Sequence, residues 1–127
     1  MKHKLLSTAA LLCAAVAVLA QGNNSNVTSN GTGNTATVVQ AGSINNSSIN
    51  QLGNTNLASS NQLGSANLST QSQTGDNNSA FNDFFGGPGQ NGNGNSVNQS
   101  QNGNGNFMWD NQFGDNNIAT QDRKSVV

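Results

Sequence analysis

The sequence predicts an all-β fold, a two-sheet β-solenoid of about four 22-residue coils with cross-β stacking. Two observations lead to this prediction: an 11-residue unit recurs eight times, and the chain is rich in Asn, Gln, Ser and Gly. Only 7% of the 127 residues are charged and 32% are hydrophobic, too few to fill an ordinary apolar core. A chain of this composition is either disordered or prone to β-aggregation, so the order of its residues must decide between the two.

The repeat holds one phase along most of the chain, which indicates a repeat architecture. Its consensus is Q-x-G-x-x-N-x-A/S-x-x-x, and the eight units are 29–39, 40–50, 51–61, 62–72, 73–83, 90–100, 101–111 and 112–122. The first position is Gln in seven units: Gln40, Gln51, Gln62, Gln73, Gln90, Gln101 and Gln112. The third is Gly in all eight: Gly31, Gly42, Gly53, Gly64, Gly75, Gly92, Gly103 and Gly114. The sixth is Asn in all eight: Asn34, Asn45, Asn56, Asn67, Asn78, Asn95, Asn106 and Asn117. A single six-residue insertion at 84–89 accounts for the one break in spacing.

Each unit predicts one strand and one turn. Gly and Asn tolerate positive φ, so G-x-x-N every eleven residues predicts a recurring tight turn. The stretch between turns, such as 56–63, predicts a strand of about six to eight residues. Two units then form one coil with two strands, and eight units form four coils.

The alternation of side chains along a strand places the sixth, eighth and tenth positions and the next first position on one face. We expect this face to point inward, because small residues at the eighth position, such as Ala58 and Ser69, let two sheets approach as in a dry steric zipper. An unpaired buried amide costs about 1–3 kcal/mol. Identical Gln and Asn residues stacked every ~4.8 Å avoid that cost by forming hydrogen-bonded ladders.

The first twenty residues have the pattern of a secretory signal peptide. Lys2, His3 and Lys4 precede an apolar run at 11–19, and small residues lead up to Ala20. Cleavage after Ala20 would remove the only Cys and the only His of the chain. The remaining chain would contain five Asp and two cations, a net charge of −3, and no Glu, Tyr, His or Cys.

This mature composition argues against several functional classes. It lacks the usual general acids, bases and soft metal ligands, so we expect no enzyme, no metal site and no cofactor. Its two cations, Arg123 and Lys124, sit together at the C-terminus, which is not the footprint of a nucleic-acid-binding protein. The polar chain after residue 20 predicts no integral membrane segment.

The unit resembles a known repeat. Residues 51–62, QLGNTNLASSNQ, and residues 112–121 match the curlin repeat of bacterial curli fibre subunits, and the resemblance covers 29–122. It implies a β-solenoid subunit that leaves the cell through a dedicated outer-membrane pore with the help of chaperones. It also implies assembly with itself and a nucleator subunit into extracellular amyloid fibres of the biofilm matrix. By this analogy 21–28 is a short export-targeting segment and 123–127 a C-terminal tail.

Three features of the chain depart from a uniform repeat. The tenth position, which is often aliphatic in curlins, changes from Val38 and Ile49 to polar residues in the later units. These later residues are Ser60, Gln71, Asn82, Gln99, Asp110 and Gln121.

The insertion 84–89 is expected as a loop at a corner of the third coil, either a contact site or a tolerated insertion. Large apolar residues at outward positions either drive bundling of filaments or are ordinary exposed residues; they are Leu52, Leu57, Leu63, Leu68, Phe81, Phe107, Trp109 and Phe113.

Charge is also unevenly distributed. No charged residue occurs from 21 to 75, and all five Asp follow. One interpretation is that Asp76, Asp110 and Asp115 are gatekeepers that slow assembly, in which case replacement by Asn shortens the lag before fibres form. The alternative is that the charge is merely uneven.

The function expected from these observations is a structural subunit of a secreted fibre at the cell surface. The main alternative is a minor nucleator of the same fibres, for which the basic pair Arg123–Lys124 is suited, although the regular repeats favour the bulk subunit. A second alternative is a monomeric solenoid that binds ice or carbohydrate. The Thr residues, such as Thr35 and Thr37, do not recur from coil to coil as an ice-binding face would require.

Overall fold

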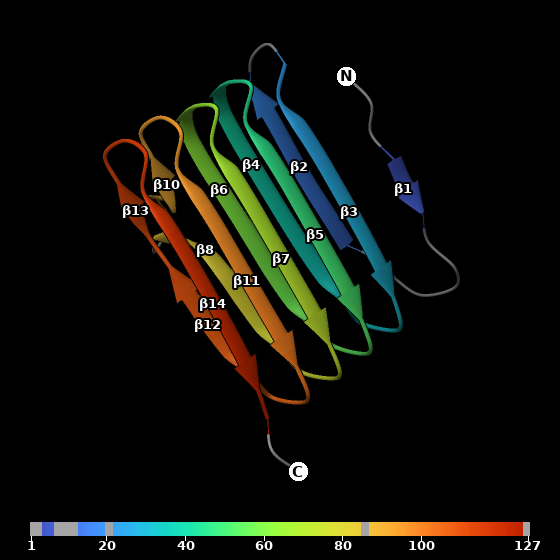
Figure 1. Cartoon of the computed structure of the whole chain (residues 1–127). Coiled ribbons are helices and arrows are strands. Elements are labelled where there is room, and N and C mark those ends of the chain that lie inside the picture. Colours follow the sequence, from blue (N-terminus) through green and yellow to red (C-terminus); the bar gives the residue numbers. More distant parts are fainter. Residues whose placement is uncertain (1–3, 7–12, 20–21, 85–86, 126–127) are drawn as a thin grey trace.

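The fold is a β-solenoid of two facing parallel sheets (Figure 1). The computed structural model describes residues 4–6, 13–19, 22–84 and 87–125. The chain crosses from one sheet to the other at each turn, so that N-terminal strands lie at one end of the stack and C-terminal strands at the other (Figure 1). The predicted all-β solenoid of about four coils of ~22 residues is therefore confirmed. The described residues include no helix that is long and apolar enough to cross a membrane.

The strands alternate between the two sheets along the sequence. Sheet 1 contains β1 (Lys4–Leu6), β3 (Asn24–Asn30), β5 (Asn46–Leu52), β7 (Leu68–Thr74), β11 (Ser96–Asn102) and β14 (Ile118–Lys124). Sheet 2 contains β2 (Cys13–Leu19), β4 (Thr35–Ser43), β6 (Leu57–Ser65), β8 (Ser79–Phe84), β10 (Gln90–Asn91), β12 (Phe107–Asp110) and β13 (Gln112–Phe113). A short strand, β9 (Gly87–Pro88), pairs antiparallel with the end of β8.

The register places each position of the repeat on its own copy in the next coil. Asn24 is paired with Asn46, and Thr35 with Leu57, an offset of 22 residues in both sheets. Across the insertion the offset becomes 28, since Leu68 is paired with Ser96. Stacked coils therefore present identical or similar side chains to one another, which is the geometry that amide ladders need.

The solenoid extends beyond the repeat boundaries expected from the sequence. In the N-terminal direction β3 begins at Asn24, and Asn23, Ser25 and Val27 are buried on the same inward face as the repeats. Most of the expected export-targeting segment 21–28 is therefore part of a paired strand. In the C-terminal direction β14 runs to Lys124, so the expected tail 123–127 begins inside a strand, and 126–127 lie outside the described residues.

Part of the expected signal peptide is also paired with the sheets in the full-length chain. β2 lies in register on β4, from Cys13 beside Thr35 to Leu19 beside Ala41, and β1 lies on β3. Residues 1–3, 7–12 and 20–21 lie outside the described residues. Removal of residues 1–20 stays a prediction; in the uncleaved chain, this segment covers the N-terminal edges of both sheets.

The turns correct one expectation. Both Gly and Asn of the G-x-x-N motif were expected to supply positive φ, but the second such residue is the one before the Asn. In one turn these residues are Gly42 (φ 105°) and Ile44 (φ 59°), whereas Asn45 is fully buried and not left-handed. Gly is required at the third position for a further reason, because a Cβ on Gly42 would overlap the backbone carbonyl of Gly64 in the next coil.

The insertion corrects another expectation. It does not bulge from a corner but interrupts a strand of sheet 2, since β6 pairs with β8 through Leu57–Ser60 and with β10 through Gln62–Leu63. The insertion leaves from the end of β8 and returns through β9 as a short hairpin, and 85–86 lie outside the described residues. Sheet 2 resumes its pairing at Gln90, which is paired with Gln62 in one neighbouring coil and with Gln112 in the other.

The interior is mostly polar. One apolar cluster lies in the N-terminal coils and consists of Val27, Ala36, Val38, Ile49 and Ala58. Elsewhere the buried residues are largely Gln, Asn and Ser, many of them without solvent exposure. Burial of apolar area is therefore a small part of what holds the later coils together, and the hydrogen bonds of these amides must supply most of the remainder.

A single turn provides a test of this backbone geometry. Gly42→Ala is expected to destabilise the fold by about 1–3 kcal/mol, because the new methyl group overlaps the next coil. Ile44→Asn is expected to stabilise it by about 1 kcal/mol, because Asn tolerates the left-handed conformation better than a β-branched residue. Midpoints of denaturant unfolding measure both changes. If both variants shift the midpoint in the same direction, the assignment of the turn positions is wrong.

Candidate functional site

The candidate functional site is the set of polar ladders inside the solenoid, together with the places where they end. In sheet 2 the ladder runs from Gln40 through Gln62 and Gln90 to Gln112. Each Nε2 donates to the Oε1 of the next Gln, at 2.8, 2.8 and 3.3 Å. In sheet 1, Gln51 donates to Gln73 at 3.0 Å, and Gln73 donates to Gln101 at 2.9 Å.

The same Gln side chains also join the two sheets. Each Nε2 makes a further bond to a backbone carbonyl of the facing sheet, as Gln40 does to Asn24 O at 3.0 Å and Gln51 to Thr35 O at 2.9 Å. Both N–H groups of the amide are then used, one along the stack and one across it. The ladder Gln are therefore cross-links between coils and between sheets.

The expected amide-to-amide bonds between sixth-position Asn residues occur at the C-terminal end, where Asn106 Nδ2 donates to Asn78 Oδ1 at 3.1 Å and Asn117 Nδ2 to Asn95 Oδ1 at 3.0 Å. The Asn residues of the earlier coils bond differently. In an internal coil the backbone N–H of Asn45 donates to Asn23 Oδ1 at 2.9 Å, and Asn45 Nδ2 donates to Gly64 O at 2.9 Å. The Asn side chain is one methylene shorter than Gln and stands beside the turn, so backbone groups of the neighbouring coils are its nearest partners. The Asn residues thus tie each turn to the next.

A third ladder, at the fourth position of the unit, was missed by the sequence reasoning. Asn54 N donates to Asp76 Oδ1 at 2.7 Å, and Asp76 N donates to Asn104 Oδ1 at 2.8 Å. On the opposite side Asn93 N donates to Asp115 Oδ1 at 2.7 Å. The signal that could have revealed it is the frequency of Asn, Asp and Ser at this position, since their short side chains accept bonds in turns.

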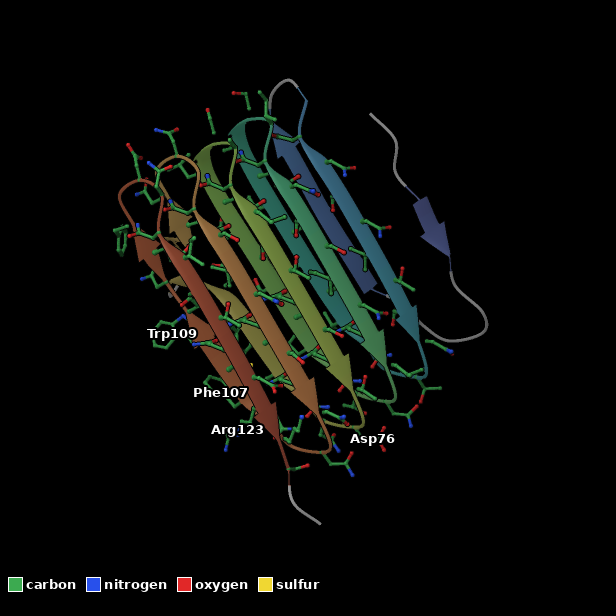
Figure 2. All side chains as sticks on the ribbon, in the orientation of Figure 1. Asp76, Phe107, Trp109 and Arg123 are labelled. Atoms are coloured by element: carbon green, nitrogen blue, oxygen red, sulfur yellow. The ribbon has the colours of Figure 1, made fainter. Side chains whose placement is uncertain are left out.

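This ladder bears on the proposed gatekeepers. Asp76, seen at the turn beyond the end of β7 in Figure 2, and Asp115 each accept a backbone hydrogen bond as well as carrying charge. Asn at either position would retain the acceptor and remove only the charge. The gatekeeper role stays a prediction, and Asp-to-Asn variants are the appropriate way to test it.

The tenth position behaves differently in the two sheets. In sheet 1 it forms an additional ladder, in which Gln71 donates to Gln99 at 2.8 Å and Gln99 to Gln121 at 2.9 Å. In sheet 2 the stacked residues are Ser60, Asn82 and Asp110. The Ser60 hydroxyl, both side-chain polar atoms of Asn82 and Asp110 Oδ2 are buried without a protein hydrogen-bond partner. The later coils therefore contain a column of weakly satisfied polar groups.

Asp110 is the titratable member of this column. Burial raises the pKa of Asp110, although a hydrogen bond from the backbone of Asn111 acts in the opposite direction. The neutral carboxyl is thus favoured by its surroundings, because an ionised group is poorly solvated there.

The two ends of the Gln ladders are chemically different. At the N-terminal end, Gln40 Oε1 and Gln51 Oε1 are buried and accept no hydrogen bond. At the C-terminal end, the place of a ladder Gln in sheet 1 is taken by Arg123 (Figure 2). Its guanidinium donates to Phe107 O at 3.1 Å, much as the Gln amides reach across, but it has no acceptor for Gln101. One end therefore offers acceptors and the other offers donors.

The predicted outward apolar residues lie at the surface. Leu52, Leu57, Leu63 and Leu68 are exposed, as are Phe107, Trp109 and Phe113. Phe107 and Trp109 lie together on β12 near the C-terminal end (Figure 2). The Phe107 ring also contacts Phe81 of the preceding coil, with 5.7 Å between centroids.

Comparison of the chain with protein families, with curated proteins and with solved structures gave no match. Within the described residues no group of three or more His, Cys, Asp or Glu side chains is placed to hold a metal ion.

A substitution within the ladder tests its contribution to stability. Gln62→Leu is expected to destabilise the fold by about 2–4 kcal/mol, because Gln40 Nε2 loses an acceptor and Gln90 Oε1 loses a donor in the interior. Asn98→Leu, on the exposed side of β11, is the control and should change stability by less than about 0.5 kcal/mol. Equal effects of the two variants in denaturant unfolding would contradict the ladder account.

Asp110 should make stability depend on pH. Because the pKa of this carboxyl is raised above the ordinary value of 3.8, the folded chain binds its proton before the unfolded chain does. Stability should therefore increase as the pH falls through the raised pKa towards 3.8. Asp110→Asn should be more stable than the wild type at neutral pH and should lack this gain. Asp110→Ser, which copies Ser60 of the same column, should behave like the Asn variant. The measurement is the midpoint of denaturant unfolding between pH 4 and 7. An equal rise of the midpoint in all three proteins as the pH falls would refute the assignment to Asp110.

Proposed function

We propose that this chain is the structural subunit of an extracellular amyloid fibre, exported with the help of a signal peptide and assembled by end-to-end stacking of its coils. The observation that carries the proposal is that the Gln ladders end in hydrogen-bonding groups without a ladder partner. Gln40 and Gln51 keep buried acceptors at one end, and Gln112 and Arg123 offer donors at the other. A second copy of the chain is the partner that supplies the complementary group at the same spacing.

The energetics favour this partner over an isolated monomer. A buried polar atom without a partner costs about 1–3 kcal/mol, and stacking satisfies such atoms at each junction. Once residues 1–20 are removed, the backbone of the terminal strands is unpaired on one side as well, and an open strand edge recruits another strand. Among the described residues of the processed chain, neither edge is covered by a capping repeat with a polar outer face, which is what stops the addition of further repeats in other solenoids.

The resemblance to curlins extends the proposal to a biological setting. The fibre would belong to a biofilm matrix at the cell surface, and export would use a dedicated outer-membrane pore with chaperones and a nucleator subunit. A role as the nucleator itself is the second candidate, favoured by Arg123 and Lys124, whose side chains are exposed and could face an anionic surface. The regular repeats favour the bulk subunit.

The test is assembly of the exported protein. The full chain is produced with its leader, the secreted product is recovered, and its mass is checked for cleavage after Ala20. At micromolar concentration we expect thioflavin T binding with a lag, removal of the lag by preformed fibres, and a fibre diffraction spacing of about 4.7–4.8 Å. A product that stays monomeric for days, with or without seed, would refute the proposed function.

A further inference from the structure

The two sheets of the processed chain contain unequal numbers of strands. Without residues 1–20, sheet 1 has five strands, β3, β5, β7, β11 and β14. Sheet 2 has four strand positions, since β8 and β10 share one and β12 and β13 share another. The processed chain thus both begins and ends with a strand of sheet 1.

This odd count conflicts with simple stacking. If β14 of one copy pairs with β3 of the next, the next copy is placed one strand spacing too far along the stack for sheet 2, and sheet 2 lacks one strand at the junction. β13 and β4 would then stand about two strand spacings apart, roughly 9.6 Å, with their backbone groups unpaired. Continuous pairing in both sheets is restored in one of two ways: a half-turn of the next copy about the stack axis, which places its β3 on sheet 2, or the loss of one of the two terminal strands of sheet 1. The half-turn keeps Ser29 beside Gln51, so the buried Gln51 acceptor stays unpaired, whereas loss of a strand can bring a donor to it.

The ladder chemistry indicates which strand leaves. While β3 stays in place, Ser29 lies above Gln51, and Gln51 Oε1 remains without a donor. Ser29 Oγ instead accepts from Asn34 Nδ2 at 3.0 Å. If β14 of a second copy takes the place of β3, the 22-residue register brings Arg123 beside Gln51.

The same register completes the ladder of sheet 2. Every internal ladder bond runs from the Nε2 of an earlier coil to the Oε1 of a later one, as from Gln40 to Gln62. Gln112 of one copy would therefore donate to Gln40 Oε1 of the next, and Arg123 to Gln51 Oε1. Both buried acceptors at the N-terminal end would be satisfied by donors that already lie at the matching positions.

We propose that copies join by strand replacement, in which β14 of one copy displaces β3 of the next from β5, so that Arg123 meets Gln51 and Gln112 meets Gln40. This inference rests on the proposed function and names the contact that forms each junction. Residues 22–30 then leave sheet 1 in every copy of the fibre except the copy at the free N-terminal end, where no β14 replaces them. Displacement exposes Val27, and Ile49 then lies beside Gln121 of the second copy instead of Val27, which costs part of the apolar cluster. Replacement therefore has a barrier and contributes to the lag.

Disulfide linkage within fibres tests the register directly. In a Cys13→Ala background, Lys124→Cys is combined with Leu52→Cys, Asn30→Cys or Thr74→Cys, all at outward positions of sheet 1. Strand replacement places position 124 beside position 52 of the next copy, at the spacing of paired strands, where a disulfide can form. The first double variant should give a ladder of covalent dimers, trimers and longer multimers on oxidation of the fibres, whereas the other two should give monomer.

Each outcome separates the inference from the proposed function. Multimers from the Asn30 variant would show that β14 pairs with β3, which overturns strand replacement but leaves fibre formation intact. Fibres in which neither the Leu52 nor the Asn30 variant forms a disulfide would also overturn strand replacement. Absence of fibres from the wild-type chain would instead overturn the proposed function. Because a cysteine variant can fail to assemble, hydrogen exchange on wild-type fibres is the second measurement. The backbone amides of 46–52 and 118–124 should be protected and those of 24–30 should exchange rapidly. Protected amides at 24–30 with rapid exchange at 118–124 would refute the inference.

Discussion

The whole structure depends on one constraint: most of the interior amides are satisfied by groups that lie one coil away. Gln62 has an acceptor because Gln90 lies above it and a donor because Gln40 lies below it. A shift of one residue in any coil would turn these amides to solvent and bring outward residues into the interior. The polar interior is therefore paired in the register that places each position of the repeat on its own copy, an offset of 22 residues or of 28 across the insertion, and this constraint explains how so few apolar residues can specify one fold.

The same constraint explains which parts of the fold the sequence revealed. Gln and Gly at fixed positions were sufficient to predict the coils, the inward face and the Gln ladders, because each of these follows from residue type and spacing. Ile44 was not recognisable as a left-handed residue, because Ile disfavours that conformation and adopts it here only where the stacked turns impose it. The extent of β3 was also hidden, since Ser25 and Val27 follow the inward pattern but Ser29 lacks the Gln that marks a unit.

The insertion and the tenth position illustrate a different limit. From the sequence a corner was the natural place for six extra residues. Instead β8 and β10 pair one after the other with the same edge of β6, and the hairpin leaves between them, from the middle of a strand position. The polar tenth residues were noticed, but their consequences differ by sheet. Gln71, Gln99 and Gln121 face carbonyls within reach. The shorter Asn82 does not reach a partner, and neither does Oδ2 of Asp110. Side-chain length, which a pattern of polar and apolar letters does not record, decides between a ladder and an unsatisfied column.

The polar interior also determines how the protein responds to temperature. Exposure of apolar surface raises the heat capacity on unfolding by about 0.45 cal/K/mol per Å², and exposure of polar surface lowers it by about 0.26. In most domains the apolar contribution dominates, and stability falls away on both sides of an optimum temperature. Here the buried side chains are mainly Gln, Asn and Ser, so the two contributions oppose each other closely. The stability curve of the folded coils is then less curved, so an assembly built from them would lose little stability on cooling, although it would still unfold on heating.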